Sequence, residues 1–198
     1  GRLTLLDGDP GQGKSWYALA VSMCVSVGQW FEVPHEHADS LMVPADVIYI
    51  TAEDDPGDTM KKRLRILQAE YPRVHHLRGK AKRDSGQMNV TMGDLPVLSK
   101  AIEAVHAKLL VIDPIQAHLP PGVDMNRAEQ TSPVLKALQG LAAAKGCAVL
   151  IVRHFGKGDK SLALHKGLGS IDIAGSARSM LICAERKDFK PPEHGPWE

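Results

Sequence analysis

The chain has 198 residues, of which 43% are hydrophobic and 24% are charged, and its formal net charge is +1. This length suits a single domain, residues 1–198, with a substantial buried core. The balanced charge excludes a uniformly basic chain, so any contact with nucleic acid must come from a local patch. No apolar run is long enough to span a membrane and no signal peptide is recognisable, so we expect a cytoplasmic protein that does not contact membranes.

The cysteines and histidines exclude two further classes of site. Cys24, Cys147 and Cys183 all fall within apolar segments and cannot all pair, so we expect buried free thiols in a reducing compartment. The histidine pairs His35/His37 and His75/His76 have no partner ligands at metal-binding spacing, so we expect no zinc site.

The first motif is GDPGQGKS, residues 8–15, which matches the phosphate-binding pattern G-x-x-x-x-G-K-S at every fixed position. A short apolar strand over 3–6 precedes it, and 16–27 reads as a helix, so a phosphate would rest on a helix N-terminus. Lys14 supplies a charge for the β- and γ-phosphates and the Ser15 hydroxyl can bind Mg²⁺. The alternative is a chance glycine-rich turn. The residues predicted to bind nucleotide are Gly8, Asp9, Pro10, Gly11, Gln12, Gly13, Lys14, Ser15 and Trp16.

The rest of the chain alternates strand and helix patterns. Four more short, apolar strands are expected over 46–51, 109–113, 148–152 and 179–184. Helices are expected over 58–70, 95–107 and 132–145, and connections over 28–45 and 78–93. This alternation predicts an α/β fold, doubly wound, with a mainly parallel sheet and helices on both faces.

Both ends of the sequence look cut. Gly1 enters the first strand directly, and the final segment, 190–198, is Pro-rich and carries no capping element. We expect this to be a core excised from a longer polypeptide; the alternative is that its ends are simply not represented.

Two carboxylates follow predicted strands, where ligands bind in an open parallel sheet. Glu53, in YITAEDD, is placed to orient and deprotonate an attacking water, with Asp54 as the second choice; the alternative is a solvated acidic loop together with Asp55. Asp113 ends LLVID, the pattern of a carboxylate that holds Mg²⁺, usually through water, although it can instead cap the following turn.

The fourth expected strand runs into the motif RHFGKG. His154 is placed to touch a γ-phosphate, although a lone histidine also serves as a structural donor. Residues 155–170 then carry four glycines, three lysines and one acid, which suits a phosphodiester backbone rather than base reading; the alternative is a plain surface loop. The predicted DNA-binding residues are Lys157, Lys160 and Lys166.

One arginine is a candidate for stabilising charge that develops on the γ-phosphate, either in its own chain or across a subunit boundary. Arg178 lies in GSARSML, just before the last expected strand. Arg186 and Lys187, just after that strand, compete for the role, and Arg178 can instead form a structural salt bridge.

Together the segments LLDGDPGQGKS, YITAEDD, LLVIDPIQAHL, VLIVRHFGKG and GSIDIAGSARSML resemble the RecA-like ATPases of the RepA replicative helicase and AAA_25 group. The resemblance implies a RecA-like P-loop core in which Glu53 activates water, His154 senses the γ-phosphate and Arg178 reaches a neighbour's nucleotide. It also implies rings, often hexameric, with the loops 117–130 and 155–170 facing the central channel. The first of these is barely basic, and the leading segment with which such rings clasp neighbours is not in the sequence.

These expectations combine into Mg²⁺-dependent ATP hydrolysis coupled to translocation on, or remodelling of, single-stranded DNA, in the replication of a plasmid, phage or integrated element. The expected partners are ATP, Mg²⁺, single-stranded DNA and further copies of the chain. The alternative is an ATP-switched regulatory or scaffold protein that acts on a protein partner without translocating. A P-loop small-molecule kinase is the third reading, and it would not need Glu53 to activate water.

Overall fold

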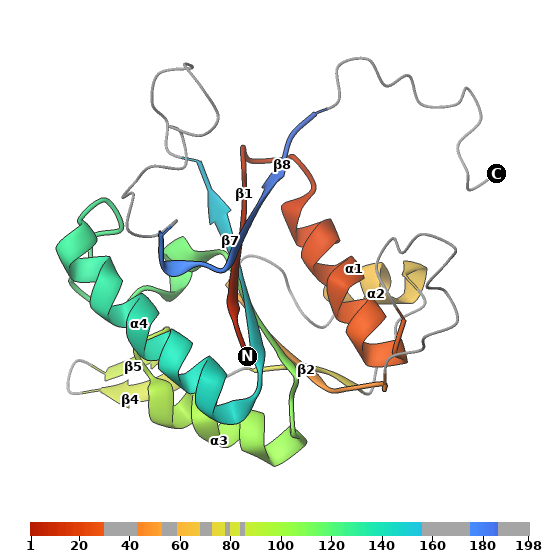
Figure 1. Cartoon of the computed structure of the whole chain (residues 1–198), viewed down its shortest axis with the longest axis horizontal. Coiled ribbons are helices and arrows are strands. Elements are labelled where there is room, and N and C mark those ends of the chain that lie inside the picture. Colours follow the sequence, from red (N-terminus) through yellow and green to blue (C-terminus); the bar gives the residue numbers. More distant parts are fainter. Residues whose placement is uncertain are drawn as a thin grey trace.

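A central parallel sheet organises the chain in the computed structural model, which describes residues 1–29, 43–52, 59–67, 73–77, 80–83, 86–155 and 175–185. Within these residues the sheet has six strands in the order β3-β2-β6-β7-β1-β8, and every pairing is parallel (Figure 1). The strands are β1 (Leu3–Gly8), β2 (Val47–Thr51), β3 (Val74–His76), β6 (Leu109–Asp113), β7 (Ala148–His154) and β8 (Ser179–Cys183). The helices are α1 (Lys14–Val27), α2 (Lys61–Ile66), α3 (Leu95–Val105) and α4 (Ala128–Lys145). The predicted α/β fold with a RecA-like P-loop core is confirmed.

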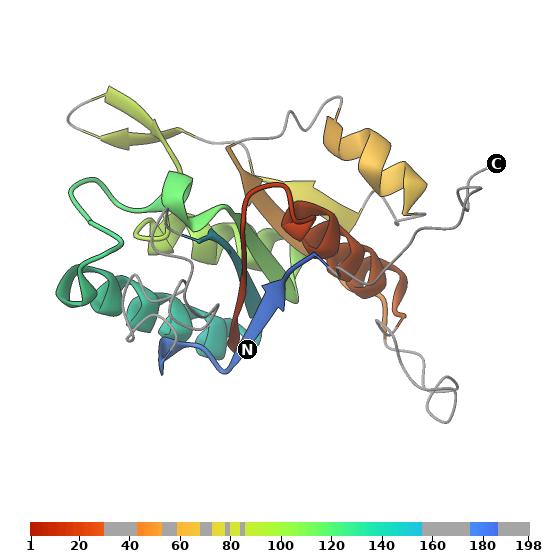
Figure 2. The ribbon, with the colours of Figure 1, turned by 90° about the horizontal axis from the view of Figure 1, so that it is seen from above.

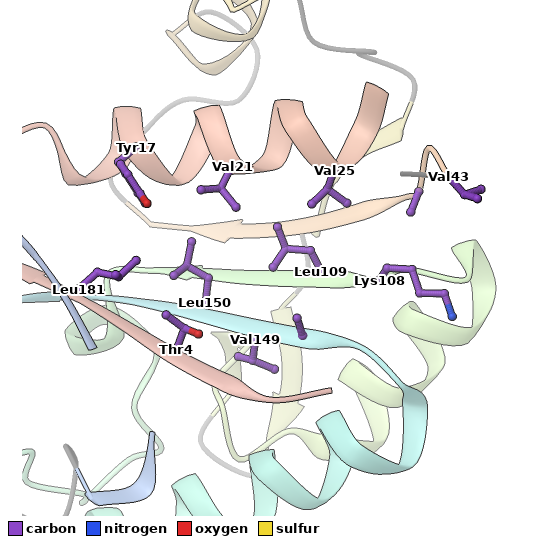
Figure 3. A pocket seen from close by; sticks show the side chains of 12 residues that line it. Thr4, Tyr17, Val21, Val25, Val43, Lys108, Leu109, Val149, Leu150 and Leu181 are labelled. Atoms are coloured by element: carbon purple, nitrogen blue, oxygen red, sulfur yellow. The ribbon is translucent and has the colours of Figure 1, made fainter. Parts of the chain in front are cut away.

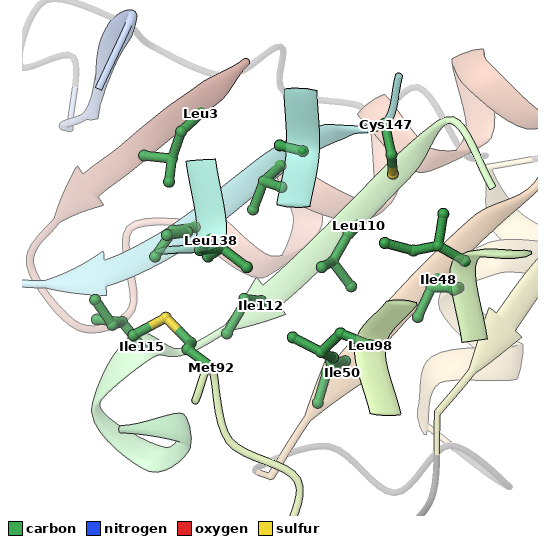
Figure 4. Packing of buried hydrophobic residues seen from close by; sticks show 14 of the residues in the cluster. Leu3, Ile48, Ile50, Met92, Leu98, Leu110, Ile112, Ile115, Leu138 and Cys147 are labelled. Carbon is green, nitrogen blue, oxygen red and sulfur yellow. The ribbon is translucent and has the colours of Figure 1, made fainter. Parts of the chain in front are cut away.

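Helices cover both faces of the sheet because the strands are apolar on both sides. Successive side chains of β1 point to opposite faces, so Leu5 packs with α3 and α4 while Leu6 packs with α1 and α2. Figure 4 shows the larger core, where Leu98 of α3 and Leu138 of α4 lie over the β6 residues Leu110 and Ile112. Burial on both faces explains why β1, β2, β6 and β7 read as continuous apolar runs rather than alternating ones.

Helix α1 packs on the face of the sheet opposite α3 and α4, and its apolar side chains point toward the strands. Tyr17, Val21 and Val25 point from the helix toward the strands, where Leu109 and Leu150 lie (Figure 3). A mostly apolar hollow of about 460 Å³ remains between them. Beside this hollow, Ala18 and Leu19 are buried in the core with Leu6 of β1, which anchors the first half of the helix to the sheet.

Backbone geometry sets the ends of the helices. Gly28 and Gly146 follow α1 and α4 with left-handed φ values of 72° and 57°, the conformation that ends a helix at least cost to glycine. His106 ends α3 in the same conformation, with φ 53°, where a side chain is less favourable. At the start of α3 the backbone oxygen of Asp94 accepts from the N–H groups of Val97 and Leu98, while its carboxylate accepts from the backbone N–H and the hydroxyl of Thr91 in the preceding turn.

Several boundaries differ from the sequence expectation. The segment 78–93, expected to be a connection, contains an antiparallel hairpin of β4 (Lys80–Arg83) and β5 (Gly86–Asn89), shown at the periphery in Figure 2. Helix α4 begins at Ala128 rather than 132 and includes Pro133, and the described part of α2 is shorter than the predicted 58–70. The edge strand β3 was not predicted, because its polar sequence VHH has no apolar run; it pairs with β2, and His75 and Arg73 contact the Asp46 carboxylate at 2.7 and 3.2 Å.

The three cysteines are free, as the sequence predicts. Cys24 and Cys147 are buried and Cys183 is half-buried. Burial raises the pKa of all three thiols, that of Cys147 to about 11. A thiol with a raised pKa stays protonated at neutral pH and is a poor nucleophile, so these residues contribute packing rather than chemistry.

Candidate nucleotide site

The glycine-rich loop connects β1 to α1 with the geometry that an anion-binding loop needs. Gly11 and Gly13 have φ values of 81° and 79°, which an L-residue with a side chain adopts only at a cost of about 1–2 kcal/mol. Gly8 is required for a different reason: a methyl group there would lie 2.5 Å from the carbonyl oxygen of Cys183 on β8. Two glycines thus shape the loop, and the third lets a neighbouring strand approach it.

The lysine of the motif is folded into the loop. Lys14 is 3% exposed, and its Nζ donates a hydrogen bond of 2.7 Å to the backbone oxygen of Asp9. The ammonium group is thereby held against the curled backbone that would cradle a phosphate, at the start of α1 where the helix dipole also favours an anion. The position fits the predicted role of Lys14.

A pocket of about 240 Å³ opens over this loop. Four loop residues line it, and three residues complete the wall from α1, α2 and β7. The loop residues are Gly11, Gly13, Lys14 and Ser15; the others are Trp16, Arg63 and His154. The sequence predicted every one of these except Arg63, which no motif marks in the helix pattern MKKRLRIL.

His154 lies where the sequence expectation requires it. It is the last residue of β7, its Cα pairs with that of Gly8, and its side chain lines the loop pocket. Backbone contacts fix it on both sides: the N–H of Phe155 donates to the Gly8 oxygen at 3.1 Å, and the side-chain amide of Gln116 donates to the His154 oxygen at 3.1 Å. A group bound in the pocket can therefore contact the point where the chain leaves β7.

Asp113 ends β6 at the same edge of the sheet and is 3% exposed. Its Oδ2 accepts a hydrogen bond of 2.7 Å from the buried hydroxyl of Tyr49 on β2. The short helix that follows, Ile115–His118, has no side-chain cap, so the capping alternative gains no support. The Ser15 hydroxyl and the Asp113 carboxylate are oxygen ligands of the kind that Mg²⁺ prefers, and in donor chemistry they fit that ion.

Several predicted residues lie outside the described part of the chain: Glu53, Asp54, Asp55, Lys157, Lys160, Lys166, Arg186 and Lys187. Strand β2 ends at Thr51, opposite Asp113, at the edge of the sheet that carries the glycine-rich loop.

Arg178 does not join this site within its own chain. Its backbone N–H donates to the Leu3 oxygen at 2.8 Å, and the next residue, Ser179, pairs with Thr4 at the start of β1. The glycine-rich loop begins at the opposite end of β1, about 17 Å away at the rise of a strand. The exposed side chain instead lines a separate hollow with Lys136 and Gln139 of α4. Any contact of Arg178 with a bound nucleotide must therefore be made in another subunit.

A buried ion pair under the loop was not predicted. Asp7 and Arg153 are 1% and 2% exposed and face each other across β1 and β7. Arg153 donates from Nε to Oδ1 at 2.9 Å and from Nη2 to Oδ2 at 2.5 Å. The residues that follow them are Gly8 and His154, so the pair fixes the two strand ends that border the pocket. The sequence did contain a sign of this pair. An acid and a base interrupt two apolar strand patterns near their ends, Asp7 in LLDG and Arg153 in IVRH.

We expect Arg153→Met to lower the free energy of unfolding by about 3–5 kcal/mol, because it leaves the Asp7 carboxylate buried without its partner. The double variant Asp7→Leu/Arg153→Met should recover much of this loss, since no uncompensated charge remains. Urea denaturation measures both. The control is Arg127→Ala, whose exposed pair with Asp124 at 3.7 Å should contribute about 1 kcal/mol or less. A loss as small as the control's for Arg153→Met would show that the pair is energetically unimportant.

Comparison with known families agrees with this geometry. A family model described as an AAA domain, that of the AAA_25 family, matches residues 1–160, which include the loop, Asp113 and His154. A search of curated proteins gives no match. Within the described part of the chain, no helix has both the length and the apolar character needed to cross a membrane. The match spans most of the chain, so this protein belongs to the AAA_25 family of AAA-type, ATP-binding domains, as its motifs predict.

Proposed function

We propose that this domain hydrolyses ATP with Mg²⁺ and couples hydrolysis to translocation on, or remodelling of, single-stranded DNA. The observation that carries the proposal is the position of His154, which lines the phosphate pocket and is the last residue before the basic segment 155–170. A change at the γ-phosphate can therefore act directly on the segment that carries Lys157, Lys160 and Lys166.

The chain's own groups divide the chemistry of hydrolysis. The loop amides and Lys14 bind the β- and γ-phosphates, and Glu53 orients the attacking water and accepts its proton. Ser15 and Asp113 would hold Mg²⁺, which neutralises charge that develops on the phosphate oxygens. Arg178 of a neighbouring copy stabilises the same charge from the far side, so the working unit is a ring of copies, which we expect to be a hexamer.

The two expected channel segments differ in how well they suit DNA. The segment 117–130 has Asp124, Arg127 and Glu129 as its charged residues, and Arg127 lies 3.7 Å from Asp124. It therefore offers little free positive charge to a phosphate backbone. This supports assigning the DNA contact to the lysines of 155–170.

The test is ATP turnover with and without single-stranded DNA, measured on the full-length chain. Stimulation by DNA supports the proposal. Slow basal turnover that only a protein partner stimulates would favour the second candidate, an ATP-switched regulatory protein that does not translocate. Transfer of phosphate to a small molecule rather than to water would identify a kinase and overturn both.

Replacing Lys157, Lys160 and Lys166 with Ala should weaken binding of single-stranded DNA and flatten its salt dependence. Three lost phosphate contacts should reduce the slope of log K against log [salt] by about 2, since each contact on a single strand contributes about 0.7. Affinity for ATP should not change. A control variant with the same change in charge replaces Lys100, Lys108 and Lys136, all exposed and outside the loop pocket. Equal slopes for the two triple variants would remove these lysines from the DNA contact.

A further inference from the structure

The hairpin of β4 and β5 carries a concentration of basic residues that the proposed hydrolysis does not use. Residues 78–89, RGKAKRDSGQMN, contain four basic residues and one acidic residue, although the formal net charge of the whole chain is only +1. Three of the basic residues, Lys80, Lys82 and Arg83, belong to β4, and neither strand contains an acid. In a chain whose overall charge is balanced, contact with nucleic acid needs a local basic segment of this kind.

The backbone of the hairpin forms an antiparallel ribbon separate from the main sheet. In the described structure, β4 and β5 pair only with each other, four residues against four. The sequences of the two strands supply one apolar cross-strand pair, Ala81 with Met88, and an isolated two-stranded ribbon is only marginally stable. Packing of a core therefore does not account for the basic sequence of β4.

The base of the hairpin is fixed to the short helix that follows β6. The buried ring of His118 donates from Nδ1 to the Val90 oxygen at 2.9 Å, and the N–H of Met92 donates to the His118 oxygen at 2.8 Å. A methyl group on Gly93 would lie 2.9 Å from Cγ of Pro120, so the two segments approach closely here as well. The ribbon thus extends from a well-held base, on the same side of the domain as the segment between β6 and α4 (Figures 1 and 2).

The same short helix borders the nucleotide site. It follows Asp113, the proposed Mg²⁺ ligand, with one residue between them. The side-chain amide of Gln116, within the helix, donates to the His154 oxygen at 3.1 Å, and His154 lines the phosphate pocket. The hairpin and the phosphate pocket are therefore both bonded to one short element, which suits a nucleic-acid contact that responds to the bound nucleotide.

We propose that the β4–β5 hairpin contacts the phosphodiester backbone of single-stranded DNA through Lys80, Lys82 and Arg83, in addition to the lysines of 155–170. The inference rests on the proposed function and adds a second DNA-contacting element to it. Lys80 and Lys82 are two residues apart in a strand and so share one face of the ribbon. Contacts with phosphates carry no sequence information directly, so the hairpin should bind strands of any sequence.

The test is the salt dependence of binding to a fluorescently labelled oligothymidine, measured by anisotropy. Lys80→Gln/Lys82→Gln/Arg83→Gln should reduce the slope of log K against log [salt] by about 2, and each single replacement by about 0.7. Lys80→Arg/Lys82→Arg/Arg83→Lys keeps the charges and should keep the parental slope. The control is Lys100→Gln/Lys108→Gln/Lys136→Gln, which removes an equal charge from exposed positions outside the hairpin and should also keep that slope.

Thermal melting and ATP titration of each variant verify that the fold and the nucleotide site are intact. A parental slope in the three single glutamine variants would overturn the inference and leave the proposed function standing. Slopes that fall equally in the hairpin and control triple variants would also overturn it, because they would show general attraction rather than contact. A hairpin that affects only stimulation by a protein partner would be a protein contact instead. A parental chain that does not bind the oligothymidine would overturn the proposed function and this inference together.

Discussion

Arg178→Ala should fold and bind ATP like the parental chain but hydrolyse it about 10³- to 10⁵-fold more slowly, the effect expected when an arginine supplied in trans is lost. The expectation follows from the position of Arg178, at the opposite end of β1 from the loop, where it cannot serve its own nucleotide. If the residue only forms an exposed salt bridge, its loss should cost about 1 kcal/mol of stability or less and leave turnover unchanged.

Mixing two inactive variants distinguishes these readings. Arg178→Ala keeps Glu53, and Glu53→Gln keeps Arg178, so some interfaces of a mixed ring pair an intact Glu53 with a neighbour's intact Arg178. Turnover should then partly return, measured as phosphate release against each variant alone. Mixed oligomers that form and stay inactive would contradict a shared site, and the ring model with it.

Lys14→Ala should nearly abolish binding of ATP. The variant leaves the phosphates in the loop without their buried cation, and losing one partner of such a pair costs about 2–5 kcal/mol, or a roughly 30- to 4,000-fold rise in Kd. Folding should change little, because the residue's hydrogen bond to the Asp9 oxygen contributes about 1 kcal/mol. Titration of ATP, with thermal melting alongside, measures both quantities.

Two further variants help to interpret the ATP affinity of Lys14→Ala. Lys136→Ala removes an equal charge from the exposed side of α4, outside the loop pocket, and should bind ATP normally. Glu53→Gln should bind ATP and lose turnover, because it affects the water and not the phosphates. Parental ATP affinity in Lys14→Ala would place the phosphates elsewhere. Parental turnover in Glu53→Gln would move the role of base to Asp54 or remove it.

The sequence predicted the parts of the fold that local pattern determines. Strands β1, β2, β6 and β7 were predicted because each is a short apolar run buried on both faces, and the start of α1 because the glycine motif fixes it. Strand β8 was predicted from its apolar run as well, although Leu181 and Ile182 are exposed. The AAA_25 resemblance is confirmed over residues 1–160. In the site, the place of Lys14 followed from the glycine-rich motif, and that of His154 from the rule that ligands bind at the carboxyl ends of parallel strands.

What sequence reasoning missed depends on contacts between distant residues. The Asp7–Arg153 pair exists because β1 and β7 are neighbours in the sheet, an order that neither residue encodes alone. Arg63 reaches the pocket only because α2 packs beside α1, and β3 is held at the sheet edge by the Asp46 carboxylate. The roles of Glu53, Arg178 and the three lysines stay predictions.

Strand β8 has a mechanical consequence for a ring of such chains. At one end, the carbonyl of Cys183 lies so close to the loop that Gly8 admits no side chain; at the other end, Arg178 immediately precedes the strand. One short, extended segment therefore touches a chain's own nucleotide loop at one end and directly follows, at the other, the arginine that we propose acts on a neighbour's nucleotide. Because β8 also pairs with β1 from Thr4 to Gly8, a displacement of the loop on losing phosphate could reach Arg178 only through these two paired strands. In the proposed ring, inserting a residue within β8 should therefore uncouple neighbouring sites while sparing ATP binding.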